Sequence, residues 1–402
     1  MGGIVIVGAG QAGASLAAKL RALGYAGAVT LIGEEPQPPY QRPPLSKAYL
    51  LGEMELERLH LRAPAFWQEQ GVTLRLATRV EAIDTEARTL RLEGGETLGY
   101  DDLALTTGSR PRRLPAEIGG DLENVFTVRT LSDVDRMAPA FRKGARALIV
   151  GGGYIGLEAA AVAAKLGLQV TLIEAAPRIL QRVAAPETAD FFRRLHAGHG
   201  VRILEGAALS RLTGEGRVTG AELADGTELA ADLVIVGIGI LPDTRLAEAA
   251  GIALENGIRT DDLGRTSAPH VWAAGDCASF PRGEGRIRLE SVGNAIDQAE
   301  AVAANMLGAN TPYRAKPWFW SDQYDVKLQI AGLNAGYDRI VTRAGEGGAL
   351  SVWYYRGATL LALDAMNDAR AYMIGKRLIE AGRSPDPAAI ADPATDLKAL
   401  LG

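Results

Sequence analysis

The sequence has one cysteine, Cys277, among its 402 residues. A single thiol excludes a disulfide framework or a dithiol redox pair within the chain. It also excludes an iron–sulfur cluster held by four cysteines of this chain, and no metal-ligating set is expected. We interpret Cys277 as a small buried residue and expect a reducing compartment, most simply the cytoplasm.

Long apolar runs and blocks of like charge are also missing. Met1 is followed closely by an I-V-I-V strand pattern, and the next stretch is interrupted by Gln11, Ser15 and Lys19. We therefore expect neither an export signal nor a membrane span. The 43 basic and 48 acidic residues are spread through the chain and give a net charge of −5. Without a basic run, neither nucleic acid nor an anionic membrane is an expected partner.

A repeated pattern of strand, glycine loop, helix and strand dominates what is present. Within about thirty residues such a pattern predicts a βαβ unit with parallel strands. The two copies lie too far apart for a solenoid, so they indicate two separate dinucleotide-binding domains. The expected elements are Ile4–Val7, Ala12–Leu23 and Val29–Ile32 in the first copy, and Ala147–Val150, Leu157–Leu166 and Val170–Ile173 in the second.

The first loop reads G-A-G-Q-A-G from Gly8 to Gly13. Gly8 allows a tight turn, Gly10 lets the backbone approach a pyrophosphate, and Gly13 lets the helix pack on the strand. The helix N-terminus offers free N–H groups to the phosphates. Glu34 ends the second strand, where its carboxylate can accept hydrogen bonds from a ribose.

The second loop repeats this logic with Gly151, Gly153 and Gly156, and Glu174 is its closing acid. An acid at this position favours NADH, because the 2′-phosphate of NADPH would meet a like charge. Arg178 and Arg182 lie nearby and leave an alternative open, since an arginine can serve a 2′-phosphate. Gly239, at the end of the apolar run 233–240, is placed with the cofactor-binding residues.

Two further motifs introduce a flavin. T-S-A-P-H-V-W-A-A-G-D, from Thr266 to Asp276, resembles the second FAD fingerprint of glutathione-reductase-like flavoproteins. In that family the strand brings an aspartate to the ribityl chain of FAD, which implies this role for Asp276. L-A-L-T-T-G, from Leu103 to Gly108, resembles the motif at the crossover to the NAD domain and includes Thr107.

Four motifs together narrow the resemblance: P-Y-Q-R-P-P-L-S-K at 39–47, G-G-G-Y-I-G-L-E at 151–158, R-L-E-S-V-G-N-A at 288–295 and P-W-F-W-S-D-Q-Y at 317–324. From residue 4 to about 385 the chain resembles the NADH-dependent ferredoxin reductases that serve bacterial haem monooxygenases and aromatic-ring dioxygenases. Gly293 departs from the family pattern, where proline is expected. The resemblance implies FAD contacts at Ala12, Glu34, Arg42, Lys47, Val80, Arg129, Asp276 and Val292.

The resemblance also implies that NADH reduces the flavin directly, so that the protein supplies orientation and electrostatics. Lys47 is the expected cation beside the flavin, and Glu158 is its expected ion-pair partner. Tyr154 and Ile155 either cover the flavin face or only pack the helix on the sheet. Trp320 is expected beside the flavin at the face where a partner docks, although W-F-W is apolar enough to form a core.

The predicted fold is α/β, with two Rossmann-like domains, one for FAD and one for NAD, and a C-terminal α+β domain. We place the FAD domain at residues 1–107 and 240–310, the NAD domain at 108–239 and the third domain at 311–402. The proline-rich segment 40–47 is expected to lack regular structure. A monomer or weak dimer is expected.

The missing cysteines also bear on the electron acceptor. Disulfide reductases of this superfamily use a cysteine pair, and single-cysteine peroxidases place a thiol just after the S-K pair, where this chain has Ala48. A one-electron carrier, a 2Fe-2S ferredoxin, is therefore the leading acceptor. An NADH oxidase, a rubredoxin reductase, and a signalling flavoprotein of the apoptosis-inducing-factor type are the alternatives.

Overall fold

The computed structural model describes residues 2–401. The chain forms two compact units, each built from three separate segments. The first comprises Met1–Arg42, Glu55–Arg110 and Ile240–Pro317, and the second comprises Pro43–Met54, Pro111–Gly239 and Trp318–Gly402. The three-domain division expected from the sequence stays a prediction.

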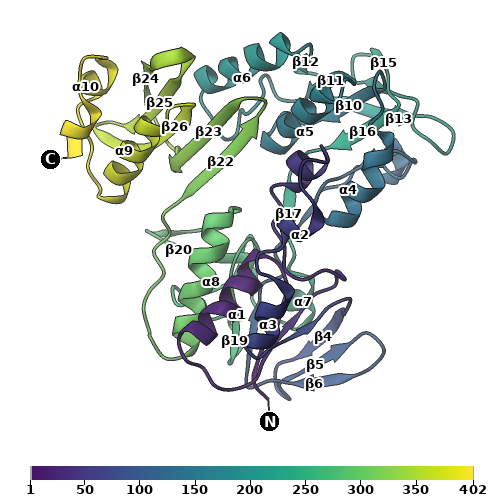
Figure 1. The fold of residues 1–402 in the computed structure, drawn as a ribbon, viewed down its shortest axis with the longest axis vertical. Coiled ribbons are helices and arrows are strands. Elements are labelled where there is room, and N and C mark those ends of the chain that lie inside the picture. The colour runs from purple at the N-terminus through teal and green to yellow at the C-terminus, as the bar shows by residue number, and fades with distance from the viewer. Residues whose placement is uncertain (1, 402) are drawn as a thin grey trace. The chain divides into compact units, whose positions relative to one another are not determined.

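The first unit is organised around a parallel five-stranded sheet with the order β19-β7-β1-β2-β3, and Figure 1 shows α1 and α8 of this unit side by side. All four residues of β1 are buried, as expected for a central strand covered on both faces. Helices α1 and α8 pack against each other, and their apolar residues join the core beside this sheet. The elements of this unit are β1 (Ile4–Val7), α1 (Gln11–Ala22), β2 (Val29–Ile32), α2 (Leu56–Leu59), α3 (Pro64–Glu69), β3 (Val72–Arg75), β4 (Val80–Asp84), β5 (Thr89–Leu92), β6 (Thr97–Gly99), β7 (Asp102–Leu105), α7 (Arg245–Ala249), β18 (Ile258–Arg259), β19 (Val271–Ala273), β20 (Ala278–Arg282), β21 (Gly285–Ile287) and α8 (Val292–Met306).

The second unit contains another parallel five-stranded sheet, with the order β12-β11-β10-β16-β9. Its central strand β10 leads through the second glycine loop into α5, which is buried along most of its length because it is rich in alanine. The elements are η1 (Leu45–Tyr49), η2 (Ala116–Ile118), β9 (Val125–Phe126), α4 (Leu131–Met137), η3 (Ala138–Ala140), β10 (Arg146–Val150), α5 (Tyr154–Lys165), β11 (Gln169–Glu174), α6 (Pro186–Gly198), β12 (Arg202–Glu205), β13 (Leu209–Thr213), β14 (Gly220–Leu223), β15 (Glu228–Ala230) and β16 (Leu233–Val236).

The C-terminal part of the second unit is an antiparallel five-stranded sheet with the order β22-β23-β26-β25-β24. Helix α9 packs on it through a core that includes Trp353 and Leu378. Strand β22 also contacts α5. The elements are β22 (Trp318–Gln323), β23 (Val326–Gly332), β24 (Arg339–Ala344), η4 (Glu346–Gly348), β25 (Leu350–Arg356), β26 (Thr359–Met366), α9 (Ala369–Glu380), α10 (Pro387–Ala391) and η5 (Leu397–Leu401).

Most of the expected elements are present, with ends that differ by a few residues. The apolar run 233–240 divides into β16 and β17 (Ile240–Pro242), which pairs with β8 (Ser109–Pro111). The prediction that residues 40–47 lack regular structure was wrong for the last three residues of this segment. Leu45, Ser46 and Lys47 belong to the π-helical turn η1, in which Lys47 has the non-helical values φ −130° and ψ −111°.

Candidate functional site

The carboxyl ends of parallel strands meet at one edge of a sheet, and ligands bind at this edge in open α/β sheets. In the first unit, four strands deliver predicted site residues there. Gly8 follows β1, Glu34 follows β2, Thr107 follows β7 and Asp276 follows β19. The topology therefore gathers residues that are up to 268 positions apart in the chain.

The first glycine loop has the backbone expected for holding a phosphate. Gly8 has φ +115°, and a Cβ there would lie 2.2 Å from the carbonyl oxygen of Thr106. A Cβ on Gly13 would lie 2.0 Å from the Gly8 oxygen, so helix and loop are too close for any side chain. A Cβ on Gly10 would meet nothing within 4 Å, which leaves open space above the start of α1. These residues fit the pyrophosphate of FAD.

Asp276 is held close to this loop by two neighbours. A Cβ on Gly275 would come within 2.9 Å of Ala12 Cβ, so the β19 end packs directly on the start of α1. Ser109 donates a hydrogen bond of 2.9 Å from Oγ to Asp276 Oδ2. The Gly275 N–H bonds to Gln298 Oε1 at 2.9 Å and fixes the turn before Asp276. The ribityl contact that the resemblance implies for Asp276 stays a prediction.

Two neighbouring acids follow β2 and have different partners. The Glu34 side chain is 57% exposed, and its Oε1 lies 3.4 Å from Arg79 Nε. Its exposure leaves it accessible to a ribose. Glu35 instead binds Arg42, with 2.7 Å between Oε1 and Nη2, and accepts a hydrogen bond from the Tyr40 hydroxyl. Arg42 therefore has an anchor that the sequence reasoning did not identify.

The remaining predicted FAD contacts lie on different elements and have different hydrogen-bond partners. Val80 is buried at the start of β4, and Val292 is the first residue of α8, whose N-cap is Ser291. Thr107 donates from its hydroxyl to the Asp243 carbonyl oxygen at 2.6 Å. Arg129 belongs to the second unit, where its N–H donates to Asp133 Oδ2 beside the N-cap of α4.

The second glycine loop has nearly the same geometry as the first. Gly151 has φ +107°, and a Cβ there would lie 2.5 Å from the Gly237 oxygen. A Cβ on Gly156 would lie 2.0 Å from the Gly151 oxygen, whereas a Cβ on Gly153 would meet nothing within 4 Å. The open position at Gly153 fits a second dinucleotide. Gly239 has φ +103°, which explains glycine there.

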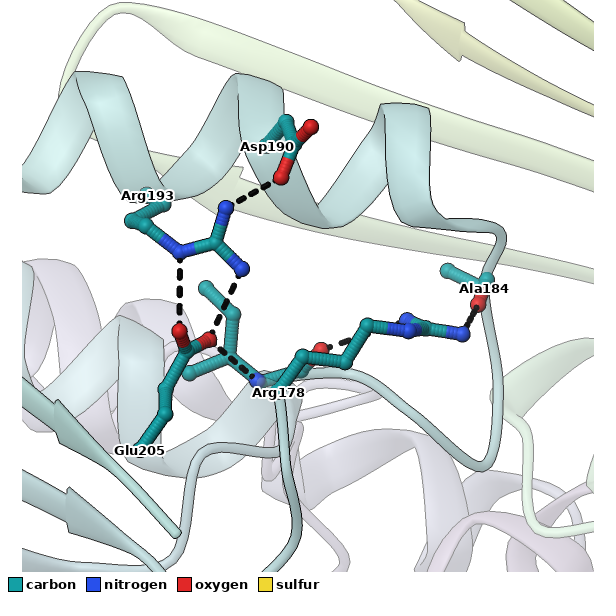
Figure 2. Close-up of polar contacts among 6 residues, drawn as sticks. Arg178, Ala184, Asp190, Arg193 and Glu205 are labelled. Carbon is teal, nitrogen blue, oxygen red and sulfur yellow. Dashed lines mark hydrogen bonds and ion pairs between the residues drawn. The ribbon is translucent and has the colours of Figure 1, made fainter.

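Glu174 closes this second site from the end of β11. Its two carboxylate oxygens accept N–H bonds from Gly152, at 2.7 Å, and from Ala176, at 2.8 Å. Figure 2 shows that Arg178 instead points into its own loop, where Nη2 donates to the Ala184 oxygen at 2.8 Å. The Arg178 side chain therefore stabilises its own loop, which argues against the alternative that it binds a 2′-phosphate. Arg182 is exposed, near Gly239.

The loop after β11 is also fixed from β12 (Figure 2). Glu205 accepts the N–H of Ile179 at 2.7 Å, and both of its oxygens bond to Arg193. Arg193 further pairs with Asp190 on its own helix. This network shapes the loop beside Glu174 without occupying the glycine cradle.

Tyr154 and Ile155 begin α5 inside the second glycine loop. The Tyr154 ring packs against Phe319, with 5.0 Å between ring centroids, and its hydroxyl is buried without a hydrogen-bond partner in the described structure. Burial raises the pKa of this hydroxyl well above its usual value. Ile155 is 46% exposed. The Tyr154 ring thus packs against β22, and Ile155 is exposed; a cofactor contact of either residue stays a prediction. Trp320 stacks with Trp318 and is only partly buried.

Lys47 and Glu158 form the ion pair that the sequence predicted. Lys47 Nζ lies 2.9 Å from Glu158 Oε1, and the two side chains are only 17% and 5% exposed. Asp322 Oδ2 lies 3.8 Å from the same ammonium. Burial raises the pKa of Glu158, while Lys47 and a hydrogen bond from Ser321 act to lower it. The pair is thus a desolvated charge pair rather than a surface helix pair.

Several contributors were missed by sequence reasoning. Thr106 donates to the oxygens of Val7 and Gly8 and so ties β7 to the first loop. Ser109, Glu35 and Ser321 each bind a predicted site residue directly. Ser321 lies within the motif at 317–324, and Ser109 directly follows the motif at 103–108, so their position in the sequence could have indicated a role. For Glu35, the only indication in the sequence was its place next to Glu34.

The predicted small buried cysteine is confirmed. Cys277 is fully buried, and burial raises the pKa of its thiol. Within residues 2–401, no three His, Cys, Asp or Glu side chains come together in a way that could hold a metal ion. Over the same residues, no helix has the length and apolar character needed to cross a membrane.

Two cradles for dinucleotides and a buried Lys–Glu pair define a flavin- and nicotinamide-dependent oxidoreductase. The family model described as pyridine nucleotide-disulphide oxidoreductase matches residues 2–299, and a reductase C-terminal model matches 318–401. The chain belongs to the pyridine nucleotide-disulphide oxidoreductase family, as an oxidoreductase that uses FAD and NADH.

The chain is similar along its whole length to reductases of ferredoxins. It is 46% identical over 404 residues to a ferredoxin–NAD(P)+ reductase from Sphingomonas sp., covering 99% of this chain and 97% of the relative. It is 45% identical over 403 residues to the ferredoxin reductase subunit of 5,5'-dehydrodivanillate O-demethylase from Sphingobium sp., covering 98% and 97%. A solved putidaredoxin reductase–putidaredoxin complex matches with TM-score 0.95 and 39% identity, covering 100% of this chain and 98% of that chain.

Proposed function

We propose that this protein transfers electrons from NADH through FAD to a 2Fe-2S ferredoxin that serves a bacterial haem monooxygenase or aromatic-ring dioxygenase. The observation that carries the proposal is the combination of two open glycine cradles with a buried Lys47–Glu158 pair at 2.9 Å. The full-length similarity to reductases whose names specify a ferredoxin supports the choice of acceptor.

The absence of a second thiol narrows the acceptor class. Cys277 is the chain's one cysteine and is fully buried. A relay that passes electrons through a cysteine pair within the chain is therefore excluded. When bound, FAD supplies the conversion of a two-electron donor, NADH, into a source of single electrons. A one-electron iron–sulfur carrier suits that output.

The proposed cofactor contacts are given for each unit by itself. The glycine loop of the first unit holds the FAD pyrophosphate, and Asp276 holds the ribityl chain. The proposed FAD contacts are Gly8, Gly10, Ala12, Gly13, Glu34, Arg42, Val80, Thr107, Asp276 and Val292 of the first unit, with Lys47, Arg129 and Trp320 of the second.

The nicotinamide dinucleotide takes the second cradle. Its proposed contacts are Gly151, Gly153, Tyr154, Ile155, Gly156, Glu174 and Gly239. Glu174 sets the preference for NADH because its charge repels a 2′-phosphate. The phenol of Tyr154 is packed on Phe319 and excludes water from that end of α5.

Lys47 and Glu158 are the proposed catalytic residues. The Lys47 ammonium stabilises negative charge that develops next to it during reduction, and Glu158 fixes the position of that ammonium. Burial strengthens the effect because fewer water molecules screen the pair. The protein itself needs no nucleophile for this reaction.

We further propose three domains with the boundaries given above, and a location in the cytoplasm. A chain whose single thiol is buried suits a reducing compartment, where disulfides are rare. An NADH supply and a small ferredoxin partner suit the same compartment.

The experiment that tests the function compares three acceptors. Purified protein with FAD and NADH is assayed for cytochrome c reduction with and without a 2Fe-2S ferredoxin, for oxygen consumption, and for rubredoxin reduction. We expect cytochrome c reduction to depend on ferredoxin and oxygen consumption to be much slower. Oxygen consumption as fast as ferredoxin-dependent turnover would identify an NADH oxidase, and a clear preference for rubredoxin would identify a rubredoxin reductase.

A further inference from the structure

One face of β22 carries two buried polar side chains that the proposed mechanism does not use. Alternation along a strand puts Phe319, Ser321 and Gln323 on the same face. Ser321 and Gln323 are fully buried even though both are polar. Buried polar side chains are costly unless they are hydrogen-bonded, so their partners identify their role.

The partners come from two helices of the same unit. Ser321 Oγ lies 2.7 Å from Glu158 Oε1 on α5, and Gln323 Oε1 lies 2.8 Å from His196 Nε2 on α6. Between them, Gln323 Nε2 lies 3.1 Å from Ser321 Oγ. Four buried side chains thus form one continuous chain that ends at the carboxylate paired with Lys47.

The carboxylate dictates the direction of every bond in this chain. An ionised Glu158 can only accept hydrogen bonds, so the Ser321 hydroxyl donates its one hydrogen to Glu158 Oε1. Ser321 Oγ then accepts from the amide of Gln323, which turns the amide oxygen of Gln323 toward His196. His196 must therefore donate from Nε2, and in the neutral ring this leaves Nδ1 as the acceptor.

The outer end of the chain is consistent with that tautomer. The Tyr324 hydroxyl lies 3.3 Å from His196 Nδ1 and can donate to it. Tyr324 also stacks on His199, with 3.6 Å between ring centroids. Burial lowers the pKa of His196, which keeps the ring neutral near pH 7. The charged groups that face Glu158 itself are Lys47 and Asp322.

We propose that Ser321 and Gln323 are positioning residues, oriented by His196, that hold Glu158 ionised and in place on Lys47. Their hydrogen bonds explain why two polar residues of the W-F-W-S-D-Q-Y segment, Ser321 and Gln323, are fully buried. The proposal rests on the proposed function, because Glu158 and Lys47 are its catalytic pair. In the segment 317–324, the proposal gives a positioning role to Ser321 and Gln323 and none to the tryptophans.

The measurement that tests the proposal is the protonation of Glu158. Infrared spectroscopy follows the C=O stretch of the protonated carboxylic acid, and its loss in Glu158→Gln assigns the band. We expect Ser321→Ala to bind the Glu158 proton about tenfold more tightly, because a hydrogen bond to a charged group is lost. Ser321→Thr keeps the hydroxyl and should restore the parent titration.

Gln323→Met and a matched serine variant complete the set. Gln323→Met removes both amide bonds at similar volume, so the Glu158 midpoint should rise by less than in Ser321→Ala, and the His196 ring should lose its fixed Nε2–H tautomer in ¹⁵N NMR spectra. Ser351→Ala is the control, since Ser351 is fully buried in the same sheet and bonds to Trp353. It should leave the Glu158 midpoint unchanged.

The outcomes separate this proposal from the proposed function. If the parent protein reduces ferredoxin but neither Ser321→Ala nor Gln323→Met moves the Glu158 midpoint, the positioning role is wrong. If Ser321→Ala moves the midpoint but the parent does not reduce ferredoxin, the positioning role stands and the proposed function is wrong. If Ser321→Ala fails to fold, Gln323→Met decides: a raised Glu158 midpoint supports the proposal, and a parent-like midpoint overturns it.

Discussion

Glu174 combines a structural and a selective role in one side chain. Its carboxylate holds the second glycine loop through the N–H groups of Gly152 and Ala176. Its charge lies where a ribose is expected, and Arg178 is committed to carbonyl oxygens of its own loop. The nearest arginine after β11 therefore does not neutralise Glu174, which is the physical reason to expect NADH.

We predict that the parent protein has a higher kcat/KM with NADH than with NADPH, and that Glu174→Gln reduces the ratio of these two values up to about fivefold. The amide keeps one of the two oxygen acceptors for the loop and removes the charge that repels the 2′-phosphate, an interaction that contributes up to about 1 kcal/mol. Steady-state kinetics with both nucleotides check this. Glu205→Gln is the matched control, because Glu205 also ends a strand and accepts a backbone N–H, but its charge is paired with Arg193. An equal fall in both variants would contradict the role of Glu174.

Asp364 is a buried acid with no role in the proposed reaction. Burial raises its pKa to about 6, although hydrogen bonds from Tyr354 and Thr188 act to lower it. Its folded-state pKa is above the unfolded value of 3.8, so the folded protein binds this proton more tightly. Stability is therefore lost as the pH rises from about 4 through about 6.

We predict that Asp364→Asn gains stability relative to the parent over this pH window, by up to about 3 kcal/mol. Urea unfolding at several pH values measures the difference. Asp232 provides a control of opposite sign, since bonds to Arg146 lower its pKa to about 2. Asp232→Asn should lose stability relative to the parent as the pH rises from about 2 through about 4, because the parent gains its contribution there. Parallel curves for the parent and Asp364→Asn would contradict the prediction.

At the level of elements, each glycine loop contains one glycine with open space at the Cβ position, and its other glycines are closely packed. Gly10 and Gly153 have free space at the Cβ position, whereas Gly13 and Gly156 face a carbonyl oxygen at 2.0 Å. The open positions serve a ligand, and the closed positions serve the packing of strand on helix.

We predict that Gly10→Ala keeps its fold and weakens FAD binding, while Gly153→Ala keeps FAD and raises the KM for NADH. A methyl group forced against a ligand costs about 1–3 kcal/mol, so each dissociation constant should rise roughly fivefold to 100-fold. Flavin absorbance after gel filtration and steady-state kinetics measure the two effects. Gly13→Ala and Gly156→Ala should instead destabilise the folded protein, as seen by thermal unfolding. Full FAD occupancy in Gly10→Ala would count against the first cradle.

Much of the fold could be predicted because its central strands are short, apolar and bounded by glycine. Ile4–Val7 and Val29–Ile32 were located to the residue. The π-helical turn at Leu45–Tyr49 was not, because two prolines before it favour irregular structure. The site was predicted where a motif specifies chemistry, as at Lys47 and Glu158. Ser321, Gln323 and His196 were missed because tertiary pairing across more than 100 residues buries them, and strand alternation alone would place polar side chains in solvent.

At the scale of the whole molecule, the net charge of −5 has to be reconciled with an acidic ferredoxin as partner. Docking must then use local basic residues rather than the overall field. Arg286 is unsuitable for this role, because its side chain is only 16% exposed and it donates to the Thr260 oxygen. Arg339 and Lys316 are exposed and remain candidates.

We predict that ferredoxin-dependent turnover falls as salt rises, through the range in which the Debye length shrinks from about 10 Å to about 3 Å. Complexes for electron transfer are small and transient, so electrostatic steering sets their rate more than burial does. NADH–ferricyanide turnover needs no protein docking and serves as the internal control, and it should fall much less over the same range. Because both assays share NADH binding and FAD reduction, a difference between them isolates the docking step. Equal salt sensitivity in the two assays would mean that no charged surface limits the reaction, and the ferredoxin assignment would lose its electrostatic basis.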